Sequence, residues 1–240
     1  MKNIIVTGCA KGLGLEISRL LAKSGYNVIG VSRTATQEYD ALINEYKDNV
    51  SFVQFDFVNT EDISSLVKSI TKEYGRIFGL INNAALGHDG VLATMHESDI
   101  SLLLKVNVEA PLLLTKYVSR SMLLNKEGRI INVGSIIGST GYNGLSVYGA
   151  TKSAMGGFTK SLARELGRAK ITVNTLAPGY METSMTGDLV GDKLDKIKRR
   201  SCLGRLANVH DASNAVLFLV SDAANGITGT TLTVDAGSTA

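Results

Sequence analysis

Three side chains in the middle of the sequence could together move a proton and hold a carbonyl oxygen. Tyr148 and Lys152 are four residues apart, so on a helix they project from the same face. Tyrosine ionises near pH 10 and is a poor acid–base catalyst at neutral pH, but a nearby ammonium favours its phenolate. Ser135 precedes them at the end of a predicted strand, where its hydroxyl can hydrogen-bond a substrate carbonyl. This pattern indicates acid–base chemistry on a carbonyl or an alcohol.

A tyrosine and a lysine at this spacing also arise by chance on solvent-facing helices, so the elements that position them matter. Apolar, β-rich runs alternate with amphipathic stretches along the whole chain. We expect strands at 3–7, 27–32, 50–55, 78–82, 129–134, 171–176 and 231–234. We expect helices near 13–24, 36–47, 60–74, 99–125, 147–168 and 209–221.

Most of these strands are solid apolar runs, which is typical of a parallel sheet covered by helices on both faces. The fold class is therefore α/β, with a doubly wound, mostly seven-stranded parallel sheet in a single domain over 1–240. Residues 182–206 lack a clear strand and carry glycine and charge. We interpret them as a substrate-binding loop or lid over the carboxyl edge of the sheet.

The stretch "TGCAKGLG" places three glycines between the first strand and the first helix, at Gly8, Gly12 and Gly14. The first permits a tight turn, the second lets the backbone approach a phosphate, and the third lets helix and strand pack closely. The helix N-terminus then offers free N–H groups to a pyrophosphate. An ordinary glycine turn is the alternative, but the position after the first strand favours a Rossmann-type dinucleotide site.

The end of the second strand indicates which dinucleotide would bind. NAD-selective sites place an acidic residue there, whereas this chain has Ser32 and Arg33, with no acid before Glu38. Lys11 in the glycine loop adds a second positive charge. Two cations can hold the 2′-phosphate of NADP(H) by charge-assisted hydrogen bonds, so NADP(H) is the predicted cofactor. The alternative is that Lys11 and Arg33 are only surface cations.

Composition and motifs argue against several other classes of protein. The net charge of +3 and the short "KIKRR" run at 196–200 give no reason to expect nucleic acid binding. Cys9 and Cys202 form no CxxC pair, and the three histidines complete no metal spacing, so we expect no metal. Without a charged-then-apolar leader or an apolar run near 20 residues, we expect a cytoplasmic protein that does not bind a membrane.

Taken together, the motifs resemble those of the short-chain dehydrogenase/reductase family, and the likeness spans the whole chain. The matching positions are "TGCAKGLG" at 7–14, Asp56, "NNAA" at 82–85, Asn107, Ser135, "YGATK" at 148–152 and "PG" at 178–179. The family often has a glycine where this chain has Ala85. The resemblance implies an NADP-dependent oxidoreductase.

The resemblance also implies a catalytic tetrad of Asn107, Ser135, Tyr148 and Lys152. In the family, the tyrosine donates or accepts the proton and the serine orients the carbonyl. The lysine lowers the pKa of the tyrosine and binds the nicotinamide ribose. The asparagine holds a water that continues a proton relay.

Cofactor contacts follow from the same resemblance. Asp56 and Phe57 would meet the adenine, Asn83 would lie along the cofactor, and Met181 and Thr183 would lie nearest the nicotinamide. The full implied set is Gly8, Lys11, Gly12, Leu13, Gly14, Ser32, Arg33, Asp56, Phe57, Asn83, Ala84, Tyr148, Lys152, Pro178, Gly179, Met181 and Thr183.

Within the family the chain most resembles bacterial 3-oxoacyl-(acyl-carrier-protein) reductases, in stretches such as "EGRIINVGSIIGSTG" and "AVLFLVSDAANGITGTTLTVDAG". This implies reduction of a 3-oxoacyl thioester in fatty acid biosynthesis, with an acidic acyl carrier protein held by basic residues near the site, for which Arg129, Arg168 and Lys170 are candidates. Two alternatives remain open. One is an enzyme acting on a sugar or another small alcohol or ketone, and the other is a non-catalytic NADP-binding sensor.

The resemblance further implies a homotetramer assembled through the helices at 99–125 and 147–168 and through the C-terminal strand segment, with a dimer as the alternative. The run "LLLKVNVEAPLLL" in the first of these helices contains more apolar residues than one inner face requires.

Overall fold

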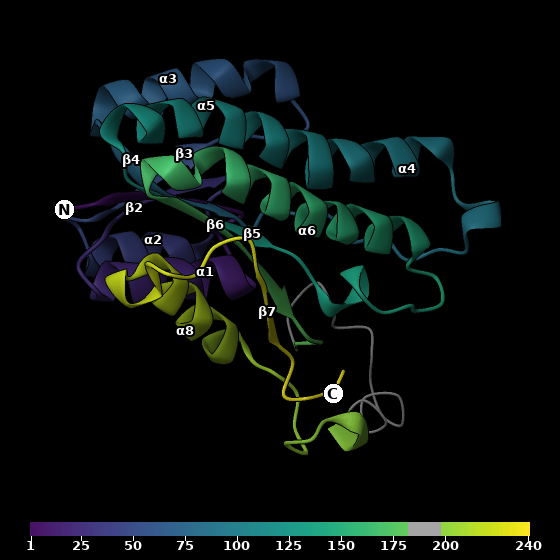
Figure 1. The fold of residues 1–240 in the computed structure, drawn as a ribbon. Coiled ribbons are helices and arrows are strands. Elements are labelled where there is room, and N and C mark those ends of the chain that lie inside the picture. Colours follow the sequence, from purple (N-terminus) through teal and green to yellow (C-terminus); the bar gives the residue numbers. More distant parts are fainter. Residues whose placement is uncertain (182–197) are drawn as a thin grey trace.

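The protein's structure, a computed structural model, describes residues 1–181 and 198–240. Its centre is a seven-stranded sheet in the order β3-β2-β1-β4-β5-β6-β7, in which every neighbouring pair is parallel (Figure 1). The strands are β1 (Asn3–Thr7), β2 (Asn27–Ser32), β3 (Val50–Gln54), β4 (Ile77–Asn82), β5 (Gly128–Val133), β6 (Ile171–Pro178) and β7 (Thr231–Val234). The predicted α/β class and doubly wound sheet are confirmed.

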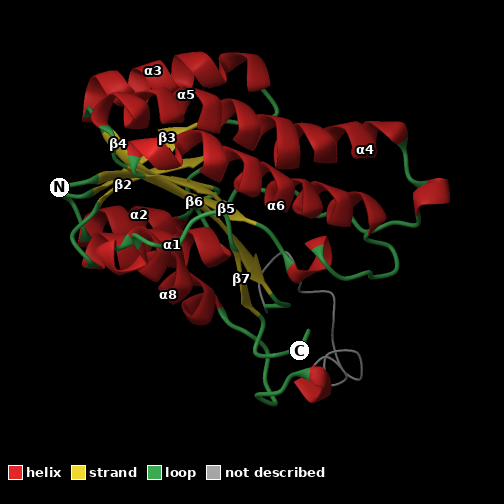
Figure 2. Ribbon diagram, in the orientation of Figure 1, coloured by secondary structure: helices red, strands yellow, loops and turns green. Residues whose placement is uncertain are grey.

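Helices cover both faces of this sheet (Figure 2). They are α1 (Gly12–Lys23), α2 (Gln37–Glu45), α3 (Ile63–Tyr74), α4 (Glu97–Leu104), α5 (Ala110–Asn125), α6 (Ser146–Leu166) and α8 (Val209–Val220). The upper layer in Figure 1 holds α3, α4, α5 and α6, and the lower layer holds α1, α2 and α8. No helix in the described parts of the chain is long and apolar enough to cross a membrane.

Each face of the sheet has its own apolar core, which explains why the strands carry few polar residues. In β1, Ile4 and Val6 pack among residues of α1 and α8, whereas Ile5 points to the other face among residues of α3 and α5. All three side chains are fully buried. Alternate residues of a strand face opposite sides of a sheet, so a strand covered on both sides must be apolar throughout.

One predicted element differs from the structure. The single helix expected at 99–125 is two helices, α4 and α5, joined by a π-helical turn over Lys105–Glu109. Turns of this kind insert an extra residue into the helical path and often lie at functional sites. Asn107 lies in this turn, so the irregularity falls on a predicted catalytic residue.

The strand order also fixes where a ligand can bind. The chain runs outward from β1 through β2 to β3, then returns to the centre and runs outward through β4 to β7. The carboxyl ends of β1 and β4 lie next to each other at this switch, where a crevice forms between diverging loops. The glycine loop follows β1, and Asn83 follows β4.

Candidate active site

Ser135 and Tyr148 lie together at the carboxyl edge of the sheet. Ser135 lies two residues after the end of β5, and its hydroxyl accepts a hydrogen bond from the backbone N–H of Ile137 at 3.2 Å. Tyr148 lies in the first turn of α6, close enough to the Ser135 side chain for that hydroxyl to lower the pKa of the phenol. The structure therefore brings together the two hydroxyls that the sequence predicted to act on one carbonyl oxygen.

The environment of Tyr148 shifts its acidity upward. Burial raises the pKa of the phenol, the hydrogen bond with Ser135 lowers it, and the carboxylate of Asp89 raises it again. The family resemblance implies a lowered pKa, so the direction here is the opposite, because desolvation penalises the phenolate. A phenol with a raised pKa keeps its proton at neutral pH and can donate it.

Lys152 lies one helical turn beyond Tyr148 with its ammonium pointing into the protein. Its Nζ donates to the carbonyl oxygen of Val133 at 3.0 Å and lies 5.6 Å from the centre of the Tyr148 ring. Burial lowers the pKa of Lys152 to about 8. The predicted pair thus shares one helix face, and the charge of the lysine can change near physiological pH.

Asn107 is held in place by both ends of its amide. Its Oδ1 accepts from the N–H of Leu86 at 2.7 Å, and its Nδ2 donates to the carbonyl of Leu86 at 2.8 Å and to the hydroxyl of Thr151 at 3.2 Å. These bonds tie the π turn to the loop after β4 and to the residue preceding Lys152. Asn107 is buried, and its bond to Thr151 places it beside the turn of α6 that carries Tyr148 and Lys152.

The glycine loop has the geometry of a phosphate cradle. Gly8 and Gly12 have φ angles of +64° and +54°, a region that favours glycine. A Cβ on Gly14 would lie 2.1 Å from the carbonyl oxygen of Gly8, so only glycine lets α1 approach the loop so closely. Leu13 is buried in the core, which leaves its backbone N–H, with that of Gly12, at the open start of α1.

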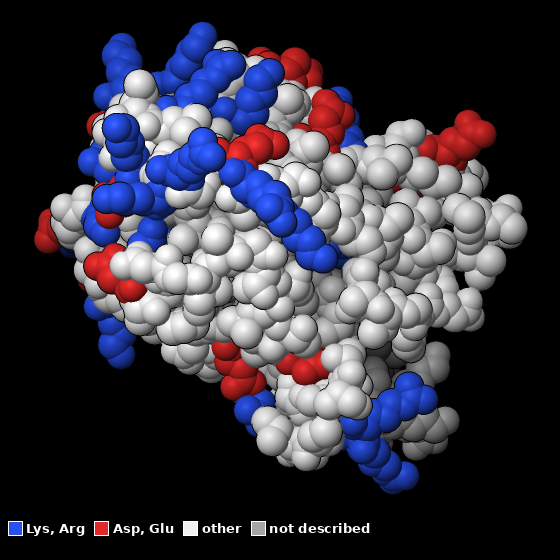
Figure 3. All heavy atoms as spheres, in the orientation of Figure 1, with Lys and Arg blue, Asp and Glu red and all other residues white. Residues whose placement is uncertain are grey.

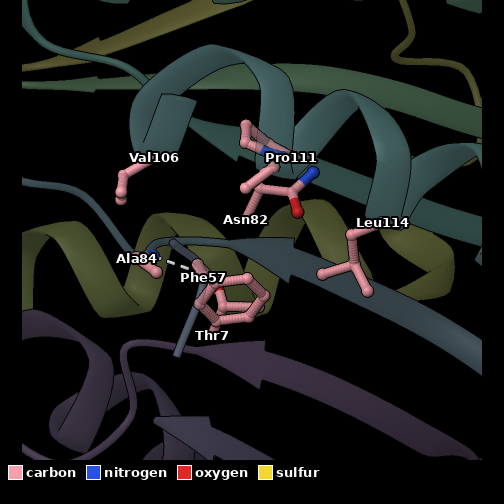
Figure 4. A pocket seen from close by; sticks show the side chains of 8 residues that line it. Thr7, Phe57, Asn82, Ala84, Val106, Pro111 and Leu114 are labelled. Carbon is pink, nitrogen blue, oxygen red and sulfur yellow. Dashed lines mark hydrogen bonds between the residues drawn. The ribbon is translucent and has the colours of Figure 1, made fainter. Parts of the chain in front are cut away.

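Thr7 joins this loop to the end of β4. Its hydroxyl accepts from the backbone N–H groups of Asn83 and Ala84, both at 2.9 Å, and Figure 4 marks the bond with Ala84. Asn83 also connects the end of β4 to the glycine loop, because its side chain donates to the carbonyl oxygens of Thr7 and Gly8 at 2.9 and 3.2 Å. Asn83 therefore shapes the predicted phosphate loop through hydrogen bonds to its backbone.

The residues predicted to meet the adenine follow β3. Asp56 accepts from the N–H of Val58 at 3.1 Å and is partly exposed. Phe57 is buried and lines a small cavity beneath α5, with Thr7, Asn82 and Ala84 also on its wall (Figure 4). With its ring in the core, Phe57 can meet an adenine only through its backbone.

The two predicted 2′-phosphate ligands are exposed on neighbouring loops. Lys11 caps the start of α1, and Arg33 directly follows Ser32, the partly buried last residue of β2. Neither side chain forms an ion pair within the described part of the chain. Both cations are thus available to an anionic ligand.

The predicted nicotinamide contacts follow β6. Pro178 ends this strand, Gly179 follows it, and Met181 is packed into the core beneath α8. A Cβ on Gly179 would lie 2.6 Å from that of Asp235, so glycine is required where these two segments meet. Thr183 lies outside the described residues, as does most of the predicted lid at 182–206.

Two further residues, which the motifs alone do not mark as site residues, support the loops of the site. The sequence does contain a signal for Thr7, since this residue places a hydroxyl at the end of a buried strand, immediately before the glycine loop. Asp235 directly follows β7, and its carboxylate accepts hydrogen bonds from Gly237, Ser238 and Thr239. Only the fold shows that this turn backs onto Gly179.

Comparison with known proteins gives a consistent match over the whole chain. The family model described as Enoyl-(Acyl carrier protein) reductase matches residues 8–239. The 3-oxoacyl-[acyl-carrier-protein] reductase FabG of Vibrio cholerae is 40% identical over 98% of this chain and 96% of its own length. FabG of Escherichia coli strain K12 is 38% identical with the same coverage.

Solved structures of similar proteins have the same fold. ElxO with NADP bound superimposes with a TM-score of 0.90 at 29% identity, covering 99% of this chain and 98% of that one. A mutant form of a Serratia marcescens short-chain dehydrogenase/reductase gives a TM-score of 0.93 at 29% identity and covers 100% of this chain and 98% of that one.

Proposed function

Because the chain belongs to the short-chain dehydrogenase/reductase family, we propose that it is an NADPH-dependent reductase of 3-oxoacyl thioesters. The observation that carries this proposal is the close pair of hydroxyls from Ser135 and Tyr148, with Lys152 one turn further along α6. The pair lies at the same sheet edge as the glycine loop. A substrate carbonyl bound between this pair and the glycine loop would have the acid Tyr148 on one side, and the loop that would hold the cofactor on the other.

The residues around the glycine loop fit NADP(H). Gly8 and Gly14 leave room where a Cβ would collide with backbone, and the start of α1 offers unpaired N–H groups to a pyrophosphate. Lys11 and Arg33 are exposed cations at the two loops that border the adenosine end of such a ligand. Residues 34–36, between Arg33 and the start of α2, include no acidic side chain.

In this mechanism the chain's own residues handle the proton and the oxygen. When bound, NADPH supplies a hydride for the carbonyl carbon. Tyr148 donates its proton to the oxygen as negative charge develops there, and Ser135 donates a hydrogen bond to the same oxygen. Lys152 supplies a positive charge beneath the phenol that stabilises the phenolate left behind. Asn107 fixes the loop after β4 against α6.

Exposed apolar side chains on loops at the carboxyl edge of the sheet support an acyl substrate. Val91 and Leu92 in the loop after β4, Tyr142 in the loop after β5, and Leu203 are all largely exposed. The first two loops are joined by a hydrogen bond from the N–H of Gly90 to the carbonyl of Gly144 at 2.9 Å. A sugar would gain little from such a rim, whereas an acyl chain would bury it.

The basic residues considered for binding a carrier protein are placed differently from the expectation. Arg129 is buried, lies over the ring of Phe78 and bonds Asn225, so it cannot contact a partner. Arg168 and Lys170 are exposed but lie before β6, at the amino edge, opposite Ser135. Figure 3 shows Lys and Arg gathered over this edge of the molecule. Basic residues at that edge cannot steer a carrier to the site of the same protomer.

A cytoplasmic homotetramer remains part of this proposal. Cys9 and Cys202 form no disulfide, which suits a reducing compartment. The outward surface of α4 and α5 has a shallow groove lined by Leu104, Val108 and Leu112, which supports assembly through this helix pair.

The test is the loss of NADPH absorbance with an acetoacetyl thioester, measured beside NADH and beside simple ketones and sugars. We expect fast oxidation of NADPH that depends on the thioester, and slow oxidation of NADH. Tyr148→Phe provides the matched control, since it keeps the fold and removes the proton.

Two other outcomes would redirect the proposal. Turnover of free ketones or sugars with no turnover of thioesters would exclude the acyl substrate and keep the enzyme class. Tight NADPH binding without turnover of any carbonyl would favour the non-catalytic sensor.

A further inference from the structure

The two cations assigned to the 2′-phosphate belong to separate loops, so their spacing must be set by something else. Lys11 lies in the glycine loop after β1, and Arg33 lies in the segment between β2 and α2. Both side chains are exposed. A phosphate dianion that binds two cations at once needs both loops at a fixed separation. A cation that is out of place cannot form its charge-assisted hydrogen bond to the phosphate.

A single hydroxyl joins the two loops directly. The Oγ1 of Thr36 donates to the carbonyl oxygen of Ala10 at 2.6 Å. Ala10 immediately precedes Lys11, and Thr36 closes the segment that begins at Arg33. The same oxygen accepts from the N–H of Tyr39 at 3.3 Å and so caps α2. The bond therefore connects the start of α2 to the backbone beside Lys11.

A buried side chain next to the Thr36–Ala10 hydrogen bond also holds the two loops together. Tyr39 is fully buried, its hydroxyl donates to the carbonyl of Ser51 at 3.3 Å, and the thiol of Cys9 lies beside it against Gly30. A Cβ on Gly30 would lie 1.9 Å from the Tyr39 hydroxyl, so this strand residue must be glycine. Two consecutive residues of the glycine loop, Cys9 and Ala10, are thus fixed against α2.

We infer that Thr36 is a positioning residue for the 2′-phosphate, which sets the spacing of Lys11 and Arg33 through its hydrogen bond to Ala10. The inference rests on the proposed NADPH site. Thr36 touches neither the reacting atoms nor the substrate. Its hydroxyl serves only the end of the cofactor that distinguishes NADPH from NADH, so its loss changes affinity for one cofactor and not for the other.

The experiment measures dissociation constants for NADPH and NADH, by cofactor fluorescence, in variants of the full chain. Thr36→Val removes the hydroxyl and keeps the shape of the side chain, and Thr36→Ser keeps the hydroxyl. We expect Thr36→Val to weaken NADPH about tenfold, as for one charge-linked hydrogen bond, and NADH less than about twofold. Thr36→Ser retains the wild-type ratio.

The loss of a helix cap needs its own control, because Thr36 also caps α2. Asn208→Ala removes the side chain that caps α8, where Asn208 accepts from the N–H of Asp211 at 2.8 Å. We expect both Thr36→Val and Asn208→Ala to lower the melting temperature, and only Thr36→Val to change the ratio of the two dissociation constants. If the ratio of the NADPH and NADH dissociation constants were the same in the two variants, Thr36 would act only as a helix cap and the inference would be wrong.

A double-mutant cycle with Arg33 tests whether Thr36 acts through the cation. In an Arg33→Ala background the spacing no longer matters, so adding Thr36→Val should cost NADPH binding little more. Fully additive losses would overturn the inference and leave the NADPH preference in place. A wild-type enzyme that binds NADPH and NADH equally would overturn both the cofactor assignment and this inference.

Discussion

At the scale of single residues, the environment of Tyr148 suits a proton donor better than a proton acceptor. Burial raises the pKa of the phenol more strongly than the hydrogen bond with Ser135 lowers it. Desolvation acts against the phenolate, and the amine of Lys152 is bonded to the carbonyl of Val133 rather than to the phenol oxygen. The proton thus stays on Tyr148 until charge develops on a substrate oxygen. The protonated phenol is the form of Tyr148 that carbonyl reduction requires.

The first prediction follows from the role of this proton. Tyr148→Phe should lower kcat at least about a hundredfold, the usual range for losing a general acid. NADPH affinity should stay within about twofold, because the phenol makes up little of the cofactor's binding surface. Single-turnover rates and fluorescence titration measure the two quantities separately. A variant with near wild-type rates would remove Tyr148 from the mechanism.

The second prediction concerns pH. Burial lowers the pKa of Lys152 to about 8, so its ammonium loses a proton as the pH rises through that value. We therefore expect kcat/KM for NADPH to be high below pH 8 and to fall above it, since kcat/KM reports groups of the free enzyme. Lys152→Arg, which keeps its charge throughout this range, should lose activity but abolish the alkaline fall. An unchanged fall in that variant would assign it to another group.

At the scale of elements, the junction between β1 and α1 is built from contacts that admit no side chain. Gly14 packs against the carbonyl of Gly8, and Asn83 donates to that same carbonyl from the end of β4. The loop is thus held from two sides before any ligand binds. This preorganisation lets the start of α1 present its N–H groups without a further loss of conformational entropy.

The third prediction tests this packing. A Cβ on Gly14 would lie 2.1 Å from the oxygen of Gly8 and 2.6 Å from Nδ2 of Asn83, so Gly14→Ala must push the helix away. We expect it to cost about 3 kcal/mol of the free energy of unfolding, as for an overpacked core, and to weaken NADPH binding strongly. Chemical denaturation measures the first effect, and fluorescence titration the second.

Gly156→Ala is the matched control for this prediction. Gly156 lies within α6, and no heavy atom outside its surroundings in the helix lies within 4 Å of a Cβ placed there. Gly156→Ala should leave the free energy of unfolding unchanged or raise it by up to about 1 kcal/mol, because alanine has the better helix propensity. Similar losses in both variants would mean that close packing at Gly14 does not hold the loop.

At the scale of the whole molecule, the helix layer that carries the site also presents an apolar outer surface. Leu104 and Leu112 are 46% and 37% exposed on α4 and α5, and both line the groove described above. Asn107 lies in the turn between these two helices. An assembly through this surface would therefore contact the segment that positions Asn107, a predicted catalytic residue.

The fourth prediction is that wild-type protein sediments as a tetramer and that Leu112→Glu yields smaller species with reduced activity. A buried charge without a partner costs several kcal/mol at an interface, which is enough to separate subunits. Lys23→Glu, on the exposed end of α1, serves as a control and should leave the assembly intact. A monomeric wild type would contradict this part of the proposed function.

The sequence by itself determined the sheet, the glycine loop and the spacing of Tyr148 and Lys152 on α6. These features depend on local signals: solid apolar runs mark strands buried on both faces, glycines at fixed spacing mark a tight turn, and four residues make about one helical turn. The predicted ends of the strands therefore differ from the observed ones by few residues. Tyr148 and Lys152 were identified for the same reason, because their relation is contained within one helix.

Only the tertiary structure decided how these parts act on one another. The π turn at Asn107 depends on bonds to Leu86 and Thr151, and the raised pKa of Tyr148 depends on how much of the fold covers it. The burial of Arg129 beside Asn225 removed a residue considered for carrier binding. Such effects come from residues far apart in the chain, and no local pattern records which distant atoms will share a desolvated space.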